Sequence, residues 1–326
     1  MVSARHDHVV RFYDRDDELV AELAGFVVEA LACAEPLVCI ATRAHREALE
    51  ALLTARGTDL DEAVSSGAYT ALDAAEALAG FMVAGRPDPD RFERVVGGLL
   101  DDVNRSGAPV RAYGEMVALL WAEGNEAAAI ELEQLWNDLA DSRDFSLLCA
   151  YPTTALLTAP LQDTNRVCAL HSEVRAPDSY IAGGPDELVI DDSVVLVAVP
   201  EAVAAARRFV ERSLPLDADV ELREDAELVV SELATNAVRH ASSAFRLSVR
   251  QDGPGLRVAV EDADVRSPRE QKPGPDERGG RGVGIVGKLS TRWGYEVREA
   301  GKVVWAELDE VRLRSVPRLR ESRRST

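Results

Sequence analysis

The stretch VVSELATNAVRHA, residues 229–241, predicts a helix with one apolar side and one polar side. Glu232, Asn236 and His240 follow one another at four-residue intervals, so at about 100° per residue they share one face. The other side carries apolar residues at three- and four-residue steps: Leu222, Ala226, Val229, Val230, Leu233 and Ala237. This spacing is typical of a helix packed on a sheet, and it turns a carboxylate, a carboxamide and an imidazole toward a site.

The sequence around this helix predicts a second domain over residues 193–311. An apolar strand, Val194–Val199, opens it and a helix follows. Alternation of apolar and polar residues marks four strand arms, joined in pairs by glycine-containing turns: Phe245–Val249 with Leu256–Val260, and Tyr295–Val297 with Val303–Leu308. Helices followed by mostly antiparallel strands predict a two-layer α/β sandwich.

The first part of the chain, residues 1–175, alternates strand and helix patterns. The predicted strands are Val9–Tyr13, Leu37–Thr42, Ala68–Leu72, Val110–Tyr113 and Phe145–Tyr151. Helices are expected from Asp16, over Ala44–Ala55 and Asp90–Asn104, and up to Leu139. This order predicts an α/β domain with a mainly parallel sheet. Residues 176–192 have the composition of a linker, and the arginine-rich residues 312–326 that of a basic, disordered tail.

Length and charge limit the class of protein. A chain of 326 residues is too long for one ordinary core, so two domains are expected. The 57 acidic and 37 basic residues give a formal charge of −20, which argues against direct nucleic-acid binding and against an anionic membrane surface. No apolar run approaches the roughly 20 residues that span a bilayer, and the start MVSARHDHVV does not read as a secretory signal. We therefore expect a cytoplasmic protein.

Metal and redox chemistry have weak support in the sequence. The four cysteines lack C-x-x-C spacing and lie in apolar stretches, so we expect buried thiols: Cys33, Cys39, Cys149 and Cys168. His6 and His8 could form a metal pair, but at a flexible start we favour histidines without a ligand role. The helix that contains Glu131 and Glu133 reads as a solvated face.

Two further motifs accompany the helix at residues 229–241. Gly282-Val-Gly284-Ile-Val-Gly287 matches G-x-G-x-x-G, but a polar, proline-containing loop precedes it where a dinucleotide-binding fold needs a strand. Glycines that lead into a short helix still let backbone N–H groups approach a phosphate. Asp262 stands at the end of a strand arm, where its carboxylate could accept a hydrogen bond from an amino group such as that of adenine.

In this order, E-L-A-T-N-A, the strand-end aspartate and GGRGVGIV resemble the N, G1 and G2 boxes of the GHKL ATPases, in particular the anti-sigma-factor serine kinases. The resemblance covers about residues 190–310 and implies the Bergerat fold with ATP and Mg²⁺ as cofactors. It makes Glu232 the general base, Asn236 the Mg²⁺ ligand and Asp262 the adenine contact. Its phosphate-lining residues are Gly280, Gly282 and Gly284, with Arg281 a further phosphate contact. Asp262 is followed by Ala263-Asp264-Val265, where the family has x-G-x-G, so adenine-pocket geometry is expected to differ.

The first domain resembles the MEDS sensory domain. The resemblance rests on HDHVVRFYDRDDEL near the start and on YGEMVALLWAEGNEAAAIELEQLWNDLA, residues 113–140, and it covers about residues 5–175. It implies a RecA-like α/β domain that has lost nucleotide binding and serves as a sensory module for a ligand that the motifs do not identify. The loop after Leu37–Thr42 agrees, since it has no G-K-[ST] phosphate cradle.

Together the resemblances imply a regulator that sequesters a sigma factor and, with Mg-ATP, phosphorylates a serine or threonine of a STAS-domain antagonist. They leave a homodimer open. One alternative is a non-catalytic switch in which ATP only changes the partner that is held. Another is a sensor histidine kinase, because His171 in HSEVRAP loosely resembles a phosphoacceptor run. The roughly 20 residues between His171 and the strand at Val194 are too few for the two-helix dimerisation hairpin of such kinases.

Overall fold

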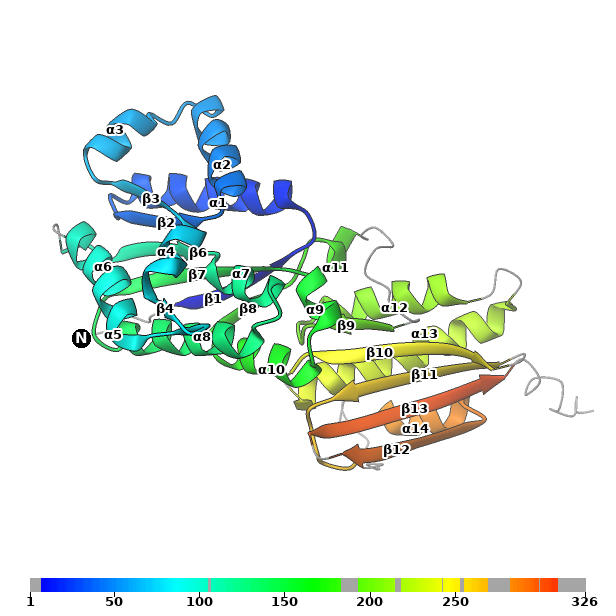
Figure 1. Cartoon of the computed structure of the whole chain (residues 1–326). Coiled ribbons are helices and arrows are strands. Elements are labelled where there is room, and N and C mark those ends of the chain that lie inside the picture. The colour runs from blue at the N-terminus through cyan, green and yellow to red at the C-terminus, as the bar shows by residue number, and fades with distance from the viewer. Residues whose placement is uncertain are drawn as a thin grey trace, which may run out of the picture. The chain divides into compact units, whose positions relative to one another are not determined.

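The structure, a computed structural model, describes residues 7–104, 107–182, 193–214, 218–241, 243–252, 255–268, 282–298 and 300–309 (Figure 1). The chain divides into two compact units, Met1–Leu188 and Val189–Thr326. Of the predicted segments, the tail at 312–326 and most of the linker at 176–192 lie outside the described residues, as does His6. Within the described ranges, no helix combines the length and apolar character needed to cross a membrane.

The first unit contains a six-stranded sheet in the order β3-β2-β6-β7-β1-β8. Its strands are β1 (His8–Tyr13), β2 (Leu37–Ala41), β3 (Tyr69–Asp73), β6 (Val110–Gly114), β7 (Phe145–Pro152) and β8 (Glu173–Arg175). All neighbouring strands pair in parallel. Every residue of β1 and β2 is buried, as expected for strands covered on both faces. The predicted α/β fold with a parallel sheet is confirmed.

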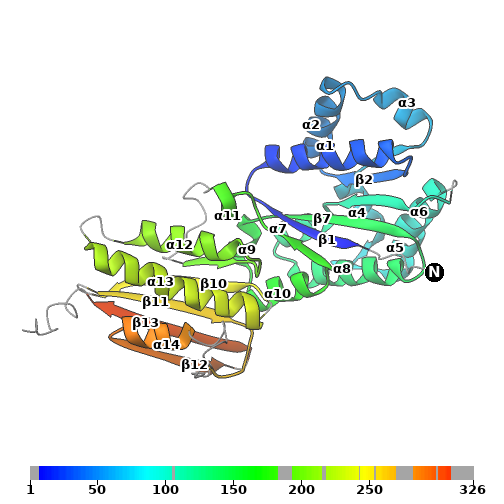
Figure 2. The ribbon, with the colours of Figure 1, turned by 180° about the vertical axis from the view of Figure 1, so that it is seen from behind.

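Helices cover both faces of this sheet, with α1 on one side and α8 on the other (Figures 1 and 2). The helices are α1 (Asp16–Ala32), α2 (Arg43–Ala55), α3 (Leu60–Ser65), α4 (Ala74–Phe81), α5 (Pro89–Phe92), η1 (Glu93–Gly97), α6 (Gly98–Val103), α7 (Met116–Ala122), α8 (Glu126–Ala140), α9 (Thr154–Thr158), α10 (Leu161–Ala169) and α11 (Ser179–Ala182). A short hairpin joins β4 (Met82–Val83) and β5 (Arg86–Pro87). The helix expected over Asp90–Asn104 is present as one continuous helical stretch, α5, η1 and α6, in which Glu93–Gly97 is a π-helix.

The expected solvated face of α8 is wrong at one position. Glu133 has no exposed surface, and its Oε1 accepts a hydrogen bond of 2.8 Å from the hydroxyl of Tyr151 on β7. Glu131 does reach the outer side, where it pairs with Arg86. The expectation for the cysteines also needs a correction, since Cys33 is exposed at the end of α1. All four thiols are free, with Cys39 and Cys149 buried.

The second unit is a five-stranded antiparallel sheet in the order β12-β13-β11-β10-β9. Its strands are β9 (Ser193–Leu196), β10 (Phe245–Asp252), β11 (Gly255–Asp262), β12 (Arg292–Arg298) and β13 (Gly301–Asp309). Three helices, α12 (Ala202–Ser213), α13 (Val220–Asn236) and α14 (Gly282–Leu289), lie on one face of the sheet (Figures 1 and 2). The predicted two-layer α/β sandwich is confirmed.

The long helix of this unit, α13, begins at a cap in which the side chain of Asp219 accepts a hydrogen bond of 2.7 Å from the N–H of Leu222. Its buried side is the predicted apolar side. Asn236 is its last residue, and a π-helix, η4 (Ala237–Ala241), continues the chain. His240 lies within η4 and is exposed, and a face that it shares with Glu232 and Asn236 stays a prediction.

Candidate functional site

Glu232 and Asn236 lie one turn apart at the C-terminal end of α13, and both are partly exposed. The first residue of α14, Gly282, packs against them. A β-carbon on Gly282 would lie 2.5 Å from Oε2 of Glu232 and 3.6 Å from Nδ2 of Asn236. A side chain at this position would have to displace the carboxylate end of Glu232, so glycine lets the helix begin in direct contact with it.

The approach of α14 places a helix N-terminus beside an acid and an amide. The first backbone N–H groups of a helix lack partners within it, and with the helix dipole they favour an anion such as a phosphate. A carboxamide oxygen beside that anion is a ligand of the hard kind that Mg²⁺ takes. Val286 anchors α14 in the core, and Gly287 lets Trp293 of β12 pack closely, since a β-carbon there would lie 3.0 Å from its Nε1.

Asp262 ends β11 and pairs across the antiparallel ladder with Lys302 of β13. Nζ of Lys302 lies 2.8 Å from Oδ1 of Asp262, and both side chains are almost fully buried, at 8% and 4% exposure. Burial raises the pKa of Asp262, although hydrogen bonds from Lys302 and from the N–H of Asp264 oppose the rise. Both bonds reach Oδ1. Within the described part of the chain, Oδ2 remains available to a further donor.

The loop after Asp262 is held by charged side chains where the related ATPases have glycines. Lys302 also lies 3.2 Å from Oδ2 of Asp264, and Arg266 donates to Oδ1 of the same carboxylate at 2.8 Å. Burial by itself would raise the pKa of Asp264, but the hydrogen bonds from Arg266 and Lys302 lower it to about 2. Arg266 also donates to the carbonyl of His240 at 2.9 Å, which ties this loop to η4.

The structure thus brings three of the predicted residues together: Glu232, Asn236 and Gly282. Asp262 lies at the end of β11, and its loop reaches the turn that follows Asn236. A β-carbon on Gly284 would have no described atom within 4 Å, so this glycine faces open space. Gly280 and Arg281 lie outside the described residues.

Lys302 is the residue that the sequence analysis missed. The signal was present, because Lys302 shares the inward side of β13 with Val304, Ala306 and Leu308. A lysine on an apolar strand face needs a buried acid, and the pairing of β13 with its sheet neighbour β11 places Asp262 directly opposite it.

His171 is placed unlike an exposed phosphoacceptor. Its side chain is fully buried, Nδ1 lies 2.7 Å from the carbonyl oxygen of Val167, and burial lowers its pKa to about 4. The preceding helix, α10, has nine residues, which is far shorter than one arm of a dimerisation hairpin. These observations count against the histidine-kinase alternative.

Two family models match the chain. The model described as MEDS, the methanogen/methylotroph, DcmR sensory domain, matches residues 7–171. The model of the histidine kinase-like ATPase domain matches residues 196–308, which include the site described above.

Comparison with curated proteins gives no match. Among solved structures, the RsbU and RsbW domains of Rv1364c from Mycobacterium tuberculosis align with 16% identity and a TM-score of 0.26. The alignment covers 54% of this chain, and the chain spans about half of that structure, 48%. At so low a TM-score, the two structures share too little for one to inform the other.

An ATPase domain with this geometry predicts that Mg-ATP stabilises the full-length chain and that Asn236→Ala removes the effect. A ligand at about 100 times its dissociation constant adds about 2.7 kcal/mol, which raises the melting temperature by several degrees. Differential scanning fluorimetry measures the shift. Ser231→Ala, on the outer side of the same helix, should keep it. A full shift in Asn236→Ala would refute the assignment of Asn236.

The ion pair between Lys302 and Asp262 predicts a large effect on stability. Lys302→Met leaves Asp262 buried without its cation and should lower the free energy of unfolding by about 3–5 kcal/mol. Adding Asp262→Asn should restore most of the loss. Urea unfolding measures both effects, and Lys288→Met, which alters an exposed lysine, should stay within about 0.5 kcal/mol of the original protein. Equal stability of Lys302→Met and Lys288→Met would show that the pair has no structural role.

Proposed function

Because the chain belongs to the MEDS sensory-domain family through residues 7–171 and carries a histidine kinase-like ATPase domain over residues 196–308, we propose that it is an ATP-dependent regulatory protein of the anti-sigma type. In this proposal the second unit binds Mg-ATP and the first unit controls it in response to a small ligand. The protein acts in the cytoplasm on protein partners.

One observation carries the proposal: the N-terminus of α14 begins against Glu232 and Asn236. Phosphoryl transfer needs a general base, a Mg²⁺ ligand and a group that binds the phosphate anion. Glu232, Asn236 and the N-terminus of α14 are proposed for these three roles, and they lie in contact with one another. The absence of a β-carbon at Gly282 lets the start of α14 come this close to the carboxylate of Glu232.

The chemistry proposed for each residue follows from its atoms. Mg-ATP, when bound, supplies the phosphoryl group and neutralises the charge that develops on it. The carboxamide oxygen of Asn236 would hold the ion. The carboxylate of Glu232 would accept the proton of the attacking hydroxyl, since a carboxylate in reach of the nucleophile is a competent general base. Oδ2 of Asp262 would accept a hydrogen bond from the adenine amino group, while Lys302 holds Oδ1.

The proposed substrate is a serine or threonine hydroxyl of a STAS-domain antagonist, and the proposed partner in the resting state is a sigma factor. The support is the resemblance of the sequence motifs in α13, β11 and α14 to those of anti-sigma-factor serine kinases. The buried position of His171 agrees with the proposal, because this histidine is not exposed to accept a phosphoryl group.

A second candidate, a non-catalytic switch, has one specific observation in its favour. Lys302 and the charged loop Asp264–Arg266 surround Asp262, where the related ATPases have glycines. A loop fixed by ion pairs rearranges less around a bound nucleotide. In this candidate function ATP is bound but its phosphoryl group is not transferred. Phosphoryl transfer to an antagonist separates the two candidates, because a switch would transfer none.

Glu232→Gln distinguishes proton transfer from binding. The amide keeps the size of the side chain but cannot take up the proton, so Mg-ATP binding should persist while transfer to the antagonist falls by about 100-fold or more. The measurement uses labelled ATP and the STAS-domain proteins of the same genome. Glu224→Gln, at an exposed position of the same helix, should transfer at the original rate. Undiminished transfer by Glu232→Gln would assign the base elsewhere.

Gly282→Ala tests the contact between α14 and α13. The added methyl group would displace the flexible end of Glu232, so transfer should fall while the melting temperature changes little. Gly98→Ala, in α6 of the first unit, is the matched control, because its β-carbon meets open space and alanine favours a helix by up to about 1 kcal/mol over glycine. If both variants transfer equally well, the packing of Gly282 on Glu232 has no part in catalysis.

A further inference from the structure

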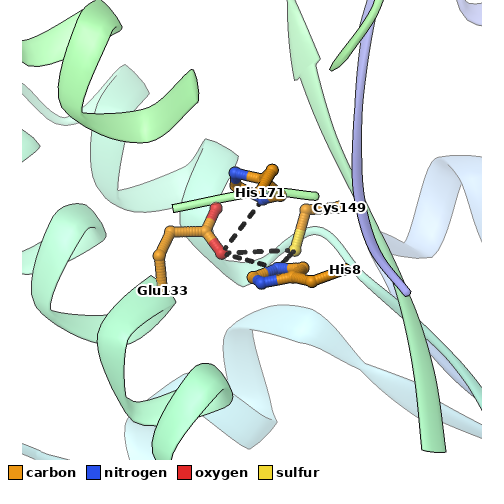
Figure 3. Close-up of side chains that lie close together, drawn as sticks. All are labelled: His8, Glu133, Cys149 and His171. Carbon is orange, nitrogen blue, oxygen red and sulfur yellow. Dashed lines mark hydrogen bonds and ion pairs between the residues drawn. The ribbon is translucent and has the colours of Figure 1, made fainter. Parts of the chain in front are cut away.

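A second cluster of polar side chains lies in the first unit, inside the layer between the sheet and α8 (Figure 3). It contains His8 at the start of β1, Glu133 on α8, Cys149 in β7 and His171 after α10. Each residue contributes one ligand atom, and these four atoms lie within 4.8 Å of one another. The four side chains are buried, with exposures between 0% and 9%.

Four of the six pairs of ligand atoms lie 3.2–3.5 Å apart, and all six pairs lie within 4.8 Å. Nε2 of His8 lies 3.2 Å from Oε2 of Glu133 and 3.4 Å from Sγ of Cys149. Oε2 of Glu133 lies 3.4 Å from Sγ of Cys149 and 3.5 Å from Nε2 of His171. Figure 3 shows the four side chains pointing toward one another from separate elements.

In His8, Glu133 and His171, the polar atom that faces away from the cluster is hydrogen-bonded to a neighbouring group. This leaves the other polar atom of each side chain facing the cluster. Nδ1 of His8 lies 2.9 Å from Oδ1 of Asn137, and the amide of Asn137 is oriented by its own bond to the carbonyl of Leu170 at 3.0 Å. That amide oxygen only accepts, so Nδ1 of His8 carries the hydrogen and Nε2 presents a lone pair. Oε1 of Glu133 accepts from Tyr151, which leaves Oε2 for the cluster.

His171 has the same arrangement. Its Nδ1 donates to the carbonyl oxygen of Val167 at 2.7 Å, so the lone pair of Nε2 also points into the cluster. Nε2 is buried and accepts no hydrogen bond from any described residue. A histidine whose outer nitrogen donates to a carbonyl while its inner nitrogen is bare has the orientation of a metal ligand.

We propose that His8, Glu133, Cys149 and His171 bind one divalent transition-metal ion, of which Zn²⁺ fits best. Zinc takes nitrogen at about 2.0–2.1 Å, oxygen at about 2.0–2.2 Å and sulfur at about 2.3 Å, and tetrahedral angles then separate the ligand atoms by about 3.3–3.6 Å. The four distances of 3.2–3.5 Å agree with that spacing.

The ligand set decides between ions. Two imidazoles and a thiolate suit a borderline ion such as Zn²⁺ and exclude Ca²⁺ and Mg²⁺, which need several oxygen ligands. Four protein ligands fill a tetrahedral shell and leave no position for a substrate, so the site is structural or regulatory. A plain ion pair between Glu133 and a protonated His8 would account for one contact, but it would leave Nε2 of His171 bare.

The ion would join parts of the sensory domain that are far apart in sequence. It would tie the first strand to α8, to β7 and to the turn before β8 (Figure 3). Such a link stabilises the folded domain, because the unfolded chain offers no assembled site. This site is independent of the proposed ATP chemistry, and its test uses no nucleotide.

The test uses the full-length chain, stripped of metal with a chelator and titrated with Co²⁺ as a spectroscopic probe for Zn²⁺. One equivalent should bind, with the visible bands of a tetrahedral ion and a thiolate-to-metal charge-transfer band, and Zn²⁺ should displace it. Cys149→Ser should lose the charge-transfer band. Cys39→Ser is the matched control, since Cys39 is equally buried in β2 of the same sheet, and it should keep the band.

A second variant tests the contribution of Asn137, the hydrogen-bond partner of Nδ1 of His8. Asn137→Ala leaves all four ligands in place and should weaken Zn²⁺ binding about 10- to 100-fold, which competition with a chromophoric chelator measures. His45→Gln alters another buried histidine with a buried glutamate partner, Glu115, and should bind Zn²⁺ as the original protein does.

X-ray absorption on the zinc-loaded original protein covers the case in which Cys149→Ser does not fold. A first shell of one sulfur and three nitrogen or oxygen atoms is expected. The proposal is wrong if the folded chain binds less than stoichiometric metal, if the shell lacks sulfur or contains two, or if a folded Cys149→Ser keeps the charge-transfer band.

Discussion

A carboxylate removed from water must be matched by cations or hydrogen-bond donors, and both units of this protein contain buried carboxylates that meet this requirement. In the first unit Glu133 accepts a hydrogen bond from Tyr151 at Oε1, and its Oε2 lies beside His8 and His171, where the proposed metal ion would supply the matching positive charge. In the second unit Asp262 collects Lys302 and the backbone of Asp264. The partners come from distant parts of the chain, so these contacts fix which segments lie together.

In the second unit this constraint positions the loop beside the proposed ATP site. The pair of Asp262 and Lys302 holds the end of β11 to β13, and Gly301 permits it, because a β-carbon there would overlap the carbonyl of Asp262. Arg266 then carries the loop to the end of α13, where Glu232 and Asn236 meet Gly282. The charged loop replaces glycines by ion pairs, which exchanges flexibility for a fixed position.

The fold class could be predicted because the two kinds of strand have different sequence patterns. Parallel strands that are buried on both faces are continuous apolar runs, whereas antiparallel strands with one buried face alternate apolar and polar residues. The metal cluster could not, since its ligands at 8, 133, 149 and 171 have no short spacing and meet only through the strand order β7-β1-β8. Glu133 was misassigned because a glutamate on a helix gives no sign of buried partners elsewhere in the chain. The π-helix after Asn236 was not predicted, because the change from α- to π-helix has no clear signal in the sequence.

Hydrogen–deuterium exchange of the full-length protein with and without Mg-ATP tests most directly whether α13, the loop after β11 and α14 form one nucleotide site. The account predicts slower exchange with Mg-ATP in residues 229–241, 262–266 and 282–290, with no comparable change in residues 7–171. Protection confined to residues 7–171, or none at saturating Mg-ATP, would contradict it.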